Sequence, residues 1–449
     1  MSSTVFGSAL FSNMFGNEEM RSIFSDEALV GRYVEVECAL ARAQARLGAI
    51  PADASEKIQQ ASRDLKVDME RMRVETENVG YPILPIVHQL SEQAGDAGGY
   101  VHWGATTQDI MDTATSLQVR DALLAVRRDL IEVRDILVDL AKRYRDTPMA
   151  GRTHLQQALP TTFGNKVAVW MSGIDRHVER VDQVLPRVAL GQFSGASGTL
   201  ASVSENGLEM QALLCEELEL GQPTMCWHVA RDGLAEAVTT LGLITGSLAK
   251  IATDVMIMSS IEFGEVFEPF VHGRGASSTM PQKRNPISSE MILAGAKLVR
   301  QHAAAMLDAM IHDFERATGP WHVEWAVLPE AFLLTGAGLG HAKFMLAGLV
   351  VDEKRMRENL DLTHGLIVAE AVMMAVAPVM GRQVAHEVVY DACRTALEQK
   401  RSLADILCEN AELVDALGGE EKVRDRCDPE AYLGLSGPMV DRAIAHLHN

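Results

Sequence analysis

The sequence lacks several features that would assign it to a function class directly. It has no excess of positive charge, because the formal net charge of its 449 residues is −20. A charge of this sign argues against binding to nucleic acid or to an anionic membrane surface. Its N-terminal region lacks a basic segment followed by an apolar run, and no uninterrupted apolar stretch is long enough to span a bilayer. We therefore expect a cytoplasmic protein with no nucleic-acid or membrane partner.

Paired cysteines and strand-like segments are also scarce. The six cysteines are scattered, and they form no C-x-x-C pair and no cluster with histidine. This pattern is typical of reduced thiols and gives no sign of a metal site. Few segments have the alternation expected of strands, and residues 194–203 are the best candidate for a short hairpin or turn.

Helical periodicity, by contrast, is strong. Hydrophobic residues make up 47% of the chain, which is ample for a buried core. From Thr113 onward, apolar residues recur at alternating spacings of three and four, which predicts a long helix packed against near-parallel neighbours. The residues of this stripe are Leu123, Val126, Leu130, Val133, Leu137 and Leu140. Further long helices are predicted over residues 162–185, 234 to beyond 255, 288–311 and 326–350.

These patterns predict an all-α protein with three helical domains. Short amphipathic helices are expected in an N-terminal domain over residues 1–112 and in a C-terminal domain over residues 355–449. The long helices form a central bundle over residues 113–354. Their apolar faces are wide and rich in Ala, Gly and Met, which indicates close contacts on more than one side. Such helices usually bury their second side in a subunit interface.

A polar stretch, Gly273–Pro286, interrupts this apolar helical sequence, and we call it the signature loop. Its glycines permit backbone angles that other residues avoid, and its prolines stop a helix from running through it. A mobile surface linker is the simplest interpretation, but loops on rigid scaffolds also carry chemistry. Its potential reactive groups are two hydroxyls, an ammonium and a carboxamide, from Ser277, Ser278, Lys283 and Asn285.

The residues Ser277 to Asn285 read S-S-T-M-P-Q-K-R-N, which resembles the signature of the fumarase/aspartase superfamily. In that family the first serine, the lysine and the asparagine are functional. The resemblance therefore implies that Ser277 is the catalytic base and that Lys283 and Asn285 stabilise developing negative charge. It also implies substrate contacts from Ser278 and Met280.

Two further motifs acquire a role from the same resemblance. Thr106, Thr107 and Gln108 directly precede the first long helix and taken alone predict only a helix cap. In the family, a run of this kind binds a substrate carboxylate, and helix N-terminal amides would add affinity for an anion. Thr153 and His154 lie between the first two long helices, where a lone histidine is usually an ordinary surface residue.

The resemblance makes Thr153 a carboxylate donor and places His154 near the leaving group, with Gln157 as a further substrate contact. Arg231 is a weaker candidate, since it could bind a substrate carboxylate or form a structural salt bridge. The segment Trp321–Trp325 could contribute to substrate recognition or to packing.

The implied reaction removes a proton alpha to a carboxylate and then expels a group from the next carbon. Its substrate would be a small anionic di- or tricarboxylate, and the chemistry requires no metal or organic cofactor. In this family, loops from three different subunits of a homotetramer meet in one active site. We therefore expect a homotetramer with active sites shared between its subunits.

The leaving group divides the possible functions. The chain length, residues 321–325 and the tail from Asp428 to Asp441 resemble the 3-carboxy-cis,cis-muconate cycloisomerase branch, which forms a lactone. His154 instead resembles the branches that expel fumarate from an N-substituted aspartate. We expect a carbon–nitrogen lyase that releases fumarate, with the cycloisomerase as the alternative. A non-catalytic structural protein on the same scaffold is a remote third possibility.

Overall fold

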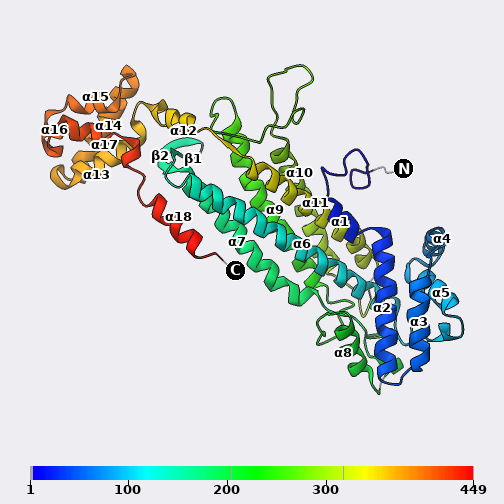
Figure 1. The fold of residues 1–449 in the computed structure, drawn as a ribbon. Coiled ribbons are helices and arrows are strands. Elements are labelled where there is room, and N and C mark those ends of the chain that lie inside the picture. Colours follow the sequence, from blue (N-terminus) through cyan, green and yellow to red (C-terminus); the bar gives the residue numbers. More distant parts are fainter. Residues whose placement is uncertain (1–3, 204, 317, 448–449) are drawn as a thin grey trace. The chain divides into compact units, whose positions relative to one another are not determined.

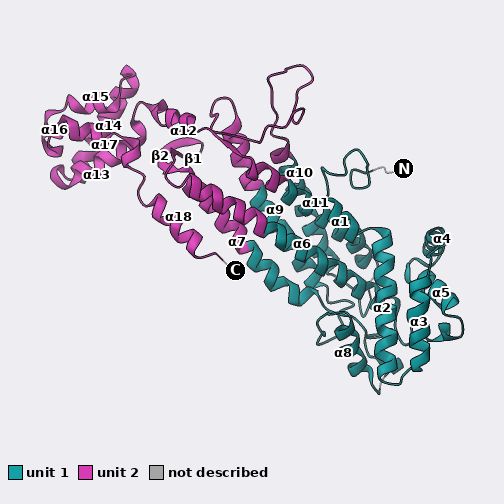
Figure 2. Ribbon diagram, in the orientation of Figure 1, with its two compact units in different colours: residues 1–130, 177–248, 291–340 teal, residues 131–176, 249–290, 341–449 magenta. Residues whose placement is uncertain are grey.

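A computed structural model describes residues 4–447 except 204 and 317. The chain is all-α, as the sequence predicts, with short strands in only a few places among the described residues (Figure 1). It divides into two compact units, which are described separately below (Figure 2). Unit 1 comprises residues 1–130, 177–248 and 291–340, and unit 2 comprises residues 131–176, 249–290 and 341–449.

The long helices lie close to where the apolar periodicity places them. They are α6 (Thr107–Arg143), α7 (Phe163–Val188), α9 (Asp232–Ser259), α10 (Ile287–Ala309) and α11 (Pro320–Ala347). The predicted stripe of α6 is buried, and Leu123, Val126 and Leu130 are fully inaccessible to solvent. Helix α6 begins six residues before the predicted start at Thr113, so the expected domain boundary at residue 112 falls inside a helix.

Unit 1 surrounds an apolar core built by its shorter helices and by segments of the long ones. The core contains Tyr33, Ile86, Ile110, Leu117 and Phe193, all of which are almost completely buried. The shorter elements of this unit are α1 (Glu18–Ile23), α2 (Asp26–Arg46), α3 (Ala52–Asp64), α4 (Met69–Val79), α5 (Ile83–Ala94), η1 (Gly95–Tyr100), η2 (Ala201–Val203) and α8 (Gly207–Glu217).

Unit 2 combines two small antiparallel sheets with a group of short helices. Strand β1 (Pro148–Thr153) pairs with β2 (Gln156–Thr162), and β3 (Val266–Phe267) pairs with β4 (Val350–Val351). The helices between residues 366 and 427 pack around Val372, Val376 and Leu403. The short helices of this unit are α12 (Glu353–Leu360), η3 (Asp361–Thr363), η4 (Leu366–Val368), α13 (Ala369–Met380), α14 (Arg382–Gln399), α15 (Leu403–Cys408), α16 (Ala411–Leu417), α17 (Glu420–Arg426), η5 (Pro429–Ala431) and α18 (Ser436–Ala445).

Of the two alternatives for residues 194–203, the structure has turns and no hairpin. The segment contains no strand, because its backbone amides donate to side chains and turns instead of to a partner strand. The hairpin lies at Pro148–Thr162.

Helix α9 is long and apolar enough to cross a membrane by length and composition. Its buried residues Val238, Leu241 and Val255 are also typical of a core helix in a globular protein.

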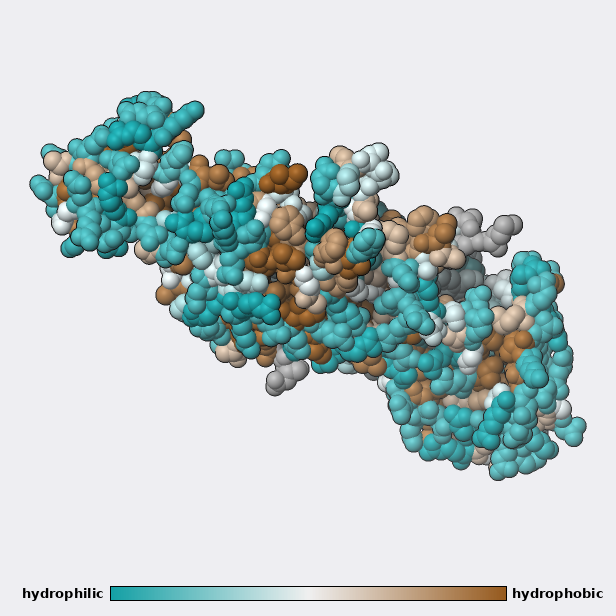
Figure 3. All heavy atoms as spheres, turned by 45° about the horizontal axis from the view of Figure 1, so that its top comes forward, coloured by the Kyte–Doolittle hydropathy of each residue, from teal (hydrophilic) through white to brown (hydrophobic). Residues whose placement is uncertain are grey.

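The space-filling view shows where apolar side chains reach the surface (Figure 3). Exposed apolar residues of unit 2 include Ile261, Phe267, Phe270 and Val271, which lie between the end of α9 and the signature loop, and Met280 within the loop. Isolated exposed apolar residues are common, but several in one segment are typical of a surface that contacts a ligand or another protein.

Candidate active site

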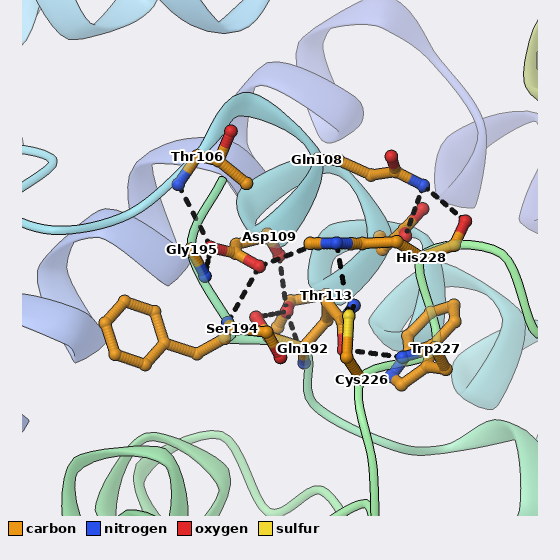
Figure 4. Close-up of polar contacts among 12 residues, drawn as sticks. Thr106, Gln108, Asp109, Thr113, Gln192, Ser194, Gly195, Cys226, Trp227 and His228 are labelled. Atoms are coloured by element: carbon orange, nitrogen blue, oxygen red, sulfur yellow. Dashed lines mark hydrogen bonds and ion pairs between the residues drawn. The ribbon is translucent and has the colours of Figure 1, made fainter. Parts of the chain in front are cut away.

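The start of α6 is held by one buried carboxylate. Asp109 is fully buried and accepts hydrogen bonds from the backbone amides of Thr106, Ser194 and Gly195, each at 3.0 Å (Figure 4). Its bond to Thr106 closes the first turn, because a side chain at the third helical position satisfies the amide of the capping residue. His228 Nε2 lies 2.9 Å from the same carboxylate. We call these five residues, together with Cys226, the Asp109 network.

The charges in this network are coupled. Burial lowers the pKa of His228, but its hydrogen bonds to Asp109 and Cys226 outweigh this effect and raise the pKa to about 9. Burial raises the pKa of the Cys226 thiol, but hydrogen bonds from His228 outweigh it and the net shift is downward. The imidazolium of His228 therefore lies between two groups that favour its positive charge.

The predicted carboxylate-binding residues differ in how far their side chains are exposed to solvent. Gln108 is buried, and its amide donates to the His228 carbonyl at 2.9 Å and to Asp112 at 3.1 Å. Thr106 and Thr107 are only half-buried. The hydroxyl of Thr106 accepts a hydrogen bond from the guanidinium of Arg316.

Arg316 is a residue that the sequence analysis missed. It belongs to the connection between α10 and α11 and contacts Thr106 across 210 positions of sequence. It supplies a cation beside the hydroxyl that the resemblance assigns to a substrate carboxylate, and guanidinium groups suit carboxylates well. A single arginine in a charged connection carries no local signal of such a contact.

For Arg231, the structure favours the structural alternative. Its side chain is almost completely buried and donates to Asp112 at 2.7 and 3.0 Å and to Glu324 at 2.9 and 2.5 Å. The indole of Trp321 also donates to Asp112, and its ring packs against Trp325. Because the donors of Arg231 already have protein acceptors, we do not carry this residue into the proposed site. Residues 321–325 likewise take part in packing.

In unit 2, the motif Thr153–Gln157 forms the tip of the β1–β2 hairpin. Thr153 pairs with Gln156, so His154 and Leu155 are the two central residues of the turn. Both have left-handed backbones, with φ values of 50° and 62°. Two-residue hairpin turns of this kind strongly favour asparagine or glycine, so histidine and leucine here are strained. Strain of this kind concentrates at functional sites.

A buried network holds the hairpin below its tip. Arg152 donates to Glu265 at 2.9 and 2.6 Å, and Glu265 is fully buried. Asn359 donates to the same carboxylate at 2.8 Å, and Gln157 donates to the Asn359 carbonyl at 2.6 Å. Gln157 therefore anchors the hairpin, while Thr153 and His154 are exposed. The His154 ring has no hydrogen-bond partner among the residues that the structure describes.

The signature loop is largely exposed and is closed by few backbone contacts. The amide of Asn285 donates to the Gly275 carbonyl at 2.9 Å, and Ala276 bridges to Arg284. Gly275 has a φ of 69°, and a Cβ atom there would lie 2.4 Å from the Asn285 carbonyl oxygen. Glycine is therefore required at this position to bring the two ends of the loop together. Glu268, which precedes the loop, accepts hydrogen bonds from the backbone amides of Ser288 and Ser289 in the first turn of α10.

Within the loop, backbone donors surround the Ser277 hydroxyl. Its oxygen accepts from the amide of Met280 at 3.1 Å and from the amide of Thr279 at 3.3 Å. Donors directed at an oxygen favour its negatively charged form. Lys283 is exposed and has no carboxylate partner within the described chain. A cavity of about 780 Å³ lies beside the loop, and Lys283, Asn285, Met280, Arg274 and Phe270 line it.

The structure thus places the predicted residues in separate groups. Thr106, Thr107 and Gln108 belong to unit 1, whereas the hairpin tip and the signature loop belong to unit 2. Among the described residues of unit 2, no hydrogen bond or ion pair joins His154 to the loop. The described chain also shows no grouping of three or more His, Cys, Asp or Glu side chains suited to a metal ion.

The all-helical fold and the signature loop define the class: this is a lyase-type scaffold whose polar loops adjoin long helices. Residues 15–300 match the lyase family, and residues 365–443 match the adenylosuccinate lyase C-terminus. The chain belongs to this lyase family, within the fumarase/aspartase superfamily, as the signature loop indicated.

Several known proteins are similar over nearly the whole chain. The 3-carboxy-cis,cis-muconate cycloisomerase of Pseudomonas aeruginosa is 44% identical, covering 99% of this chain and 98% of that protein. The N-acetyl-S-(2-succino)cysteine lyase of Enterococcus italicus is 38% identical over 99% of this chain and 98% of its own length. The crystal structure of a fumarate lyase from Mesorhizobium sp. BNC1 is 55% identical, with a TM-score of 0.92, covering 96% of this chain and 98% of that one.

Proposed function

We propose that this lyase cleaves a carbon–nitrogen bond in an N-substituted aspartate and releases fumarate. The observation that carries this proposal is the position of His154 at the strained, exposed tip of the hairpin. An amine leaving group must gain a proton as its bond to carbon breaks, and histidine titrates in the range that this step needs. A lactone-forming reaction needs no such donor, because its nucleophile is a carboxylate of the substrate itself.

In the proposed mechanism, Ser277 removes the proton alpha to a substrate carboxylate. A serine hydroxyl is a weak base, so the amides of Met280 and Thr279 must stabilise its alkoxide. Lys283 and Asn285 then stabilise the doubly charged carboxylate that forms, by placing a cation and a hydrogen-bond donor where charge develops. His154 protonates the departing nitrogen. Ser278 and Met280 contact the substrate, and no metal or organic cofactor takes part.

The substrate's second carboxylate would bind at the start of α6. Thr106 and Thr107 supply hydroxyls there, Arg316 supplies a cation, and Thr153 supplies a further donor from the hairpin. Because these residues belong to separate polar segments, we propose a homotetramer in which different subunits complete each active site. The cytoplasm is the expected compartment for this reaction.

One relative supports elimination and another supports the alternative. The Enterococcus italicus enzyme is named for a succinate that carries a substituent through sulfur, so substituted succinates are substrates within the family. The Pseudomonas aeruginosa relative, at 44% identity, favours 3-carboxy-cis,cis-muconate cycloisomerase activity as the second candidate function.

A substrate screen tests the proposal. The purified protein would be assayed for fumarate release from argininosuccinate, adenylosuccinate, iminodisuccinate and aspartate, with S-(2-succino)cysteine as the sulfur analogue. Consumption of 3-carboxymuconate would be followed in parallel. We expect fumarate from at least one nitrogen-bearing substrate. Turnover of 3-carboxymuconate alone would establish the cycloisomerase, turnover of the sulfur analogue alone would establish carbon–sulfur cleavage, and no turnover at all would favour a non-catalytic protein.

A further inference from the structure

The Asp109 network contains a nucleophile–base–carboxylate relay that the proposed reaction does not use. The sulfur of Cys226 lies 3.2 Å from His228 Nδ1, and His228 Nε2 lies 2.9 Å from Asp109 (Figure 4). The amide of Gln192 donates to the same sulfur at 3.5 Å. A thiol beside a histidine that a carboxylate orients has the arrangement of an activated nucleophile.

The other cysteines of the chain lack this arrangement. Cys38 and Cys215 are buried. Cys393, Cys408 and Cys427 are partly accessible, but burial raises the pKa of each thiol, and no histidine contacts them in the described chain. The thiolate is the reactive form of cysteine, so reactivity should concentrate at Cys226.

The surroundings of Cys226 leave a route to the sulfur. The residue is half-buried and lines a cavity of about 380 Å³, whose walls also include Leu190, Pro223, Trp227 and Leu234. The sulfur also lies near Gly198, in a turn whose neighbours Ala196, Ser197 and Thr199 are exposed. A Cβ atom at Gly198 would lie 3.0 Å from the sulfur, so glycine keeps this approach open.

We propose that Cys226 is a covalent modification site for small conjugated electrophiles, namely α,β-unsaturated carboxylates and their esters. The Cys226 thiolate adds to the β-carbon of the alkene, so a carbon–sulfur bond forms as the carbon–carbon π bond breaks. The electron pair moves to the α-carbon, which takes a proton from the His228 imidazolium or from water. The product is a neutral thioether, and no oxidant or reductant is needed. This inference does not depend on the proposed reaction, although fumarate is a member of this class of electrophiles.

Modification of Cys226 would disturb the candidate active site, because the Asp109 network connects this residue to the start of α6. The thioether carries no charge to hold the His228 imidazolium, and its bulk crowds His228, Gln192 and Gly198. His228 also contacts Asp109, which holds the Thr106 amide at the start of α6. The amides of Thr106, Ser194 and Gly195 should therefore lose protection from hydrogen exchange when Cys226 is modified.

Dimethyl fumarate, a neutral activated alkene, is the probe for the test. The full-length protein is incubated with it at pH 7, and labelling of each cysteine is followed by peptide mass spectrometry. We expect Cys226 to react at least about tenfold faster than Cys393 and Cys408, which serve as internal references. Equal or slower labelling of Cys226 would overturn the proposal.

Three variants and one structural readout, hydrogen exchange, complete the experiment. In Cys226→Ser, the probe should leave hydrogen exchange at Thr106, Ser194 and Gly195 unchanged, whereas Cys408→Ser should respond like the wild type. His228→Gln should slow Cys226 labelling by about tenfold if the imidazolium activates the thiol. If His228→Gln fails to fold, the labelling rates of Cys226, Cys393 and Cys408 in the wild type still decide whether Cys226 is the most reactive thiol. Labelling of Cys226 without increased exchange at these amides would refute the coupling to α6.

Discussion

The start of α6 and the signature loop are both polar segments that adjoin long helices, yet they are built in opposite ways. At the start of α6, one buried carboxylate satisfies three backbone amides and a histidine. The signature loop is mostly exposed and is closed by a few backbone contacts around Gly275 and Asn285. Hydrogen bonds already orient the polar groups at the start of α6. The signature loop, in contrast, contains the exposed ammonium of Lys283, which has no carboxylate partner among the described residues.

This difference matches the two tasks that we assign to them. A carboxylate-binding site gains affinity when its donors are already oriented, because binding then requires little reordering. A weak base such as Ser277 needs a site that closes around the substrate and excludes water, and closing requires a segment that is not locked beforehand. The first four predictions below each perturb one of these two segments, and the last concerns the hairpin tip.

The largest effect is expected in the signature loop. Ser277→Ala should lower kcat by about two to four orders of magnitude, since it removes the positioned base, and the protein should remain folded because the loop is exposed. Ser278→Ala is the matched control and should keep kcat within about tenfold of the wild type. Steady-state kinetics on the substrate found in the screen gives the answer, and a Ser277→Ala kcat above about a tenth of wild type places the base elsewhere.

The Asp109 network should respond in stability. Asp109→Asn leaves the charge of His228 without its partner and points an amide group at backbone donors, which should lower the free energy of unfolding by about 3–5 kcal/mol. Asp182→Asn is the control, because Asp182 pairs with Arg127 at the surface and should change the free energy by less than about 1 kcal/mol. Denaturant unfolding measures both, and equal effects would mean that the network is not a stabilising unit.

The same network should make stability depend on pH. The pKa of His228 is raised from 6.5 to about 9 in the folded state. Its contribution to stability is therefore fully present below pH 6.5 and is lost as the pH rises through about 9. The loss should be on the order of 3 kcal/mol. Unfolding free energies of wild type and His228→Gln, measured from pH 6 to pH 9.5, should converge at high pH, and parallel curves would contradict the assignment.

A smaller effect on kcat is expected from replacing glycines of the signature loop, and it separates the close approach to Asn285 from the strain of a positive φ. Gly273 and Gly275 both have positive φ values, but a Cβ atom at Gly273 meets nothing within 4 Å. Gly275→Ala should therefore push Asn285 out of place and lower kcat about tenfold more than Gly273→Ala does, because small misplacements near reacting groups are costly. Similar kcat values for the two variants would show that the close approach to Asn285 is unimportant.

Most of the helical fold follows from local signals. The alternating apolar residues from Leu123 to Leu140 predicted α6, because burial of one face is encoded in a few turns of sequence. The hairpin at Pro148–Thr162 was missed because its turn contains His154 and Leu155, and neither is a turn-forming residue. The Arg152–Glu265–Asn359 contacts below the turn join distant parts of the chain, so no local pattern announces them.

The candidate site was predictable only where it consists of contiguous motifs. Ser277, Lys283 and Asn285 could be found because their order is recognisable. Arg316 could not, since its contact with Thr106 spans 210 positions. The burial of Arg231 against Asp112 and Glu324 likewise depends on three separate segments. Such contacts form only when the helices pack, so no local pattern reveals them.

The measurement that tests the central claim most directly concerns His154. Wild type and His154→Leu would be compared by steady-state kinetics on an N-substituted aspartate and on 3-carboxymuconate. Because the side chain is exposed at the hairpin tip, the variant should remain folded. Our account predicts wild-type turnover of the nitrogen-bearing substrate, with a loss of well over about tenfold in kcat for the variant, since a proton donor is removed. Wild-type turnover confined to 3-carboxymuconate, and unchanged in His154→Leu, would contradict it.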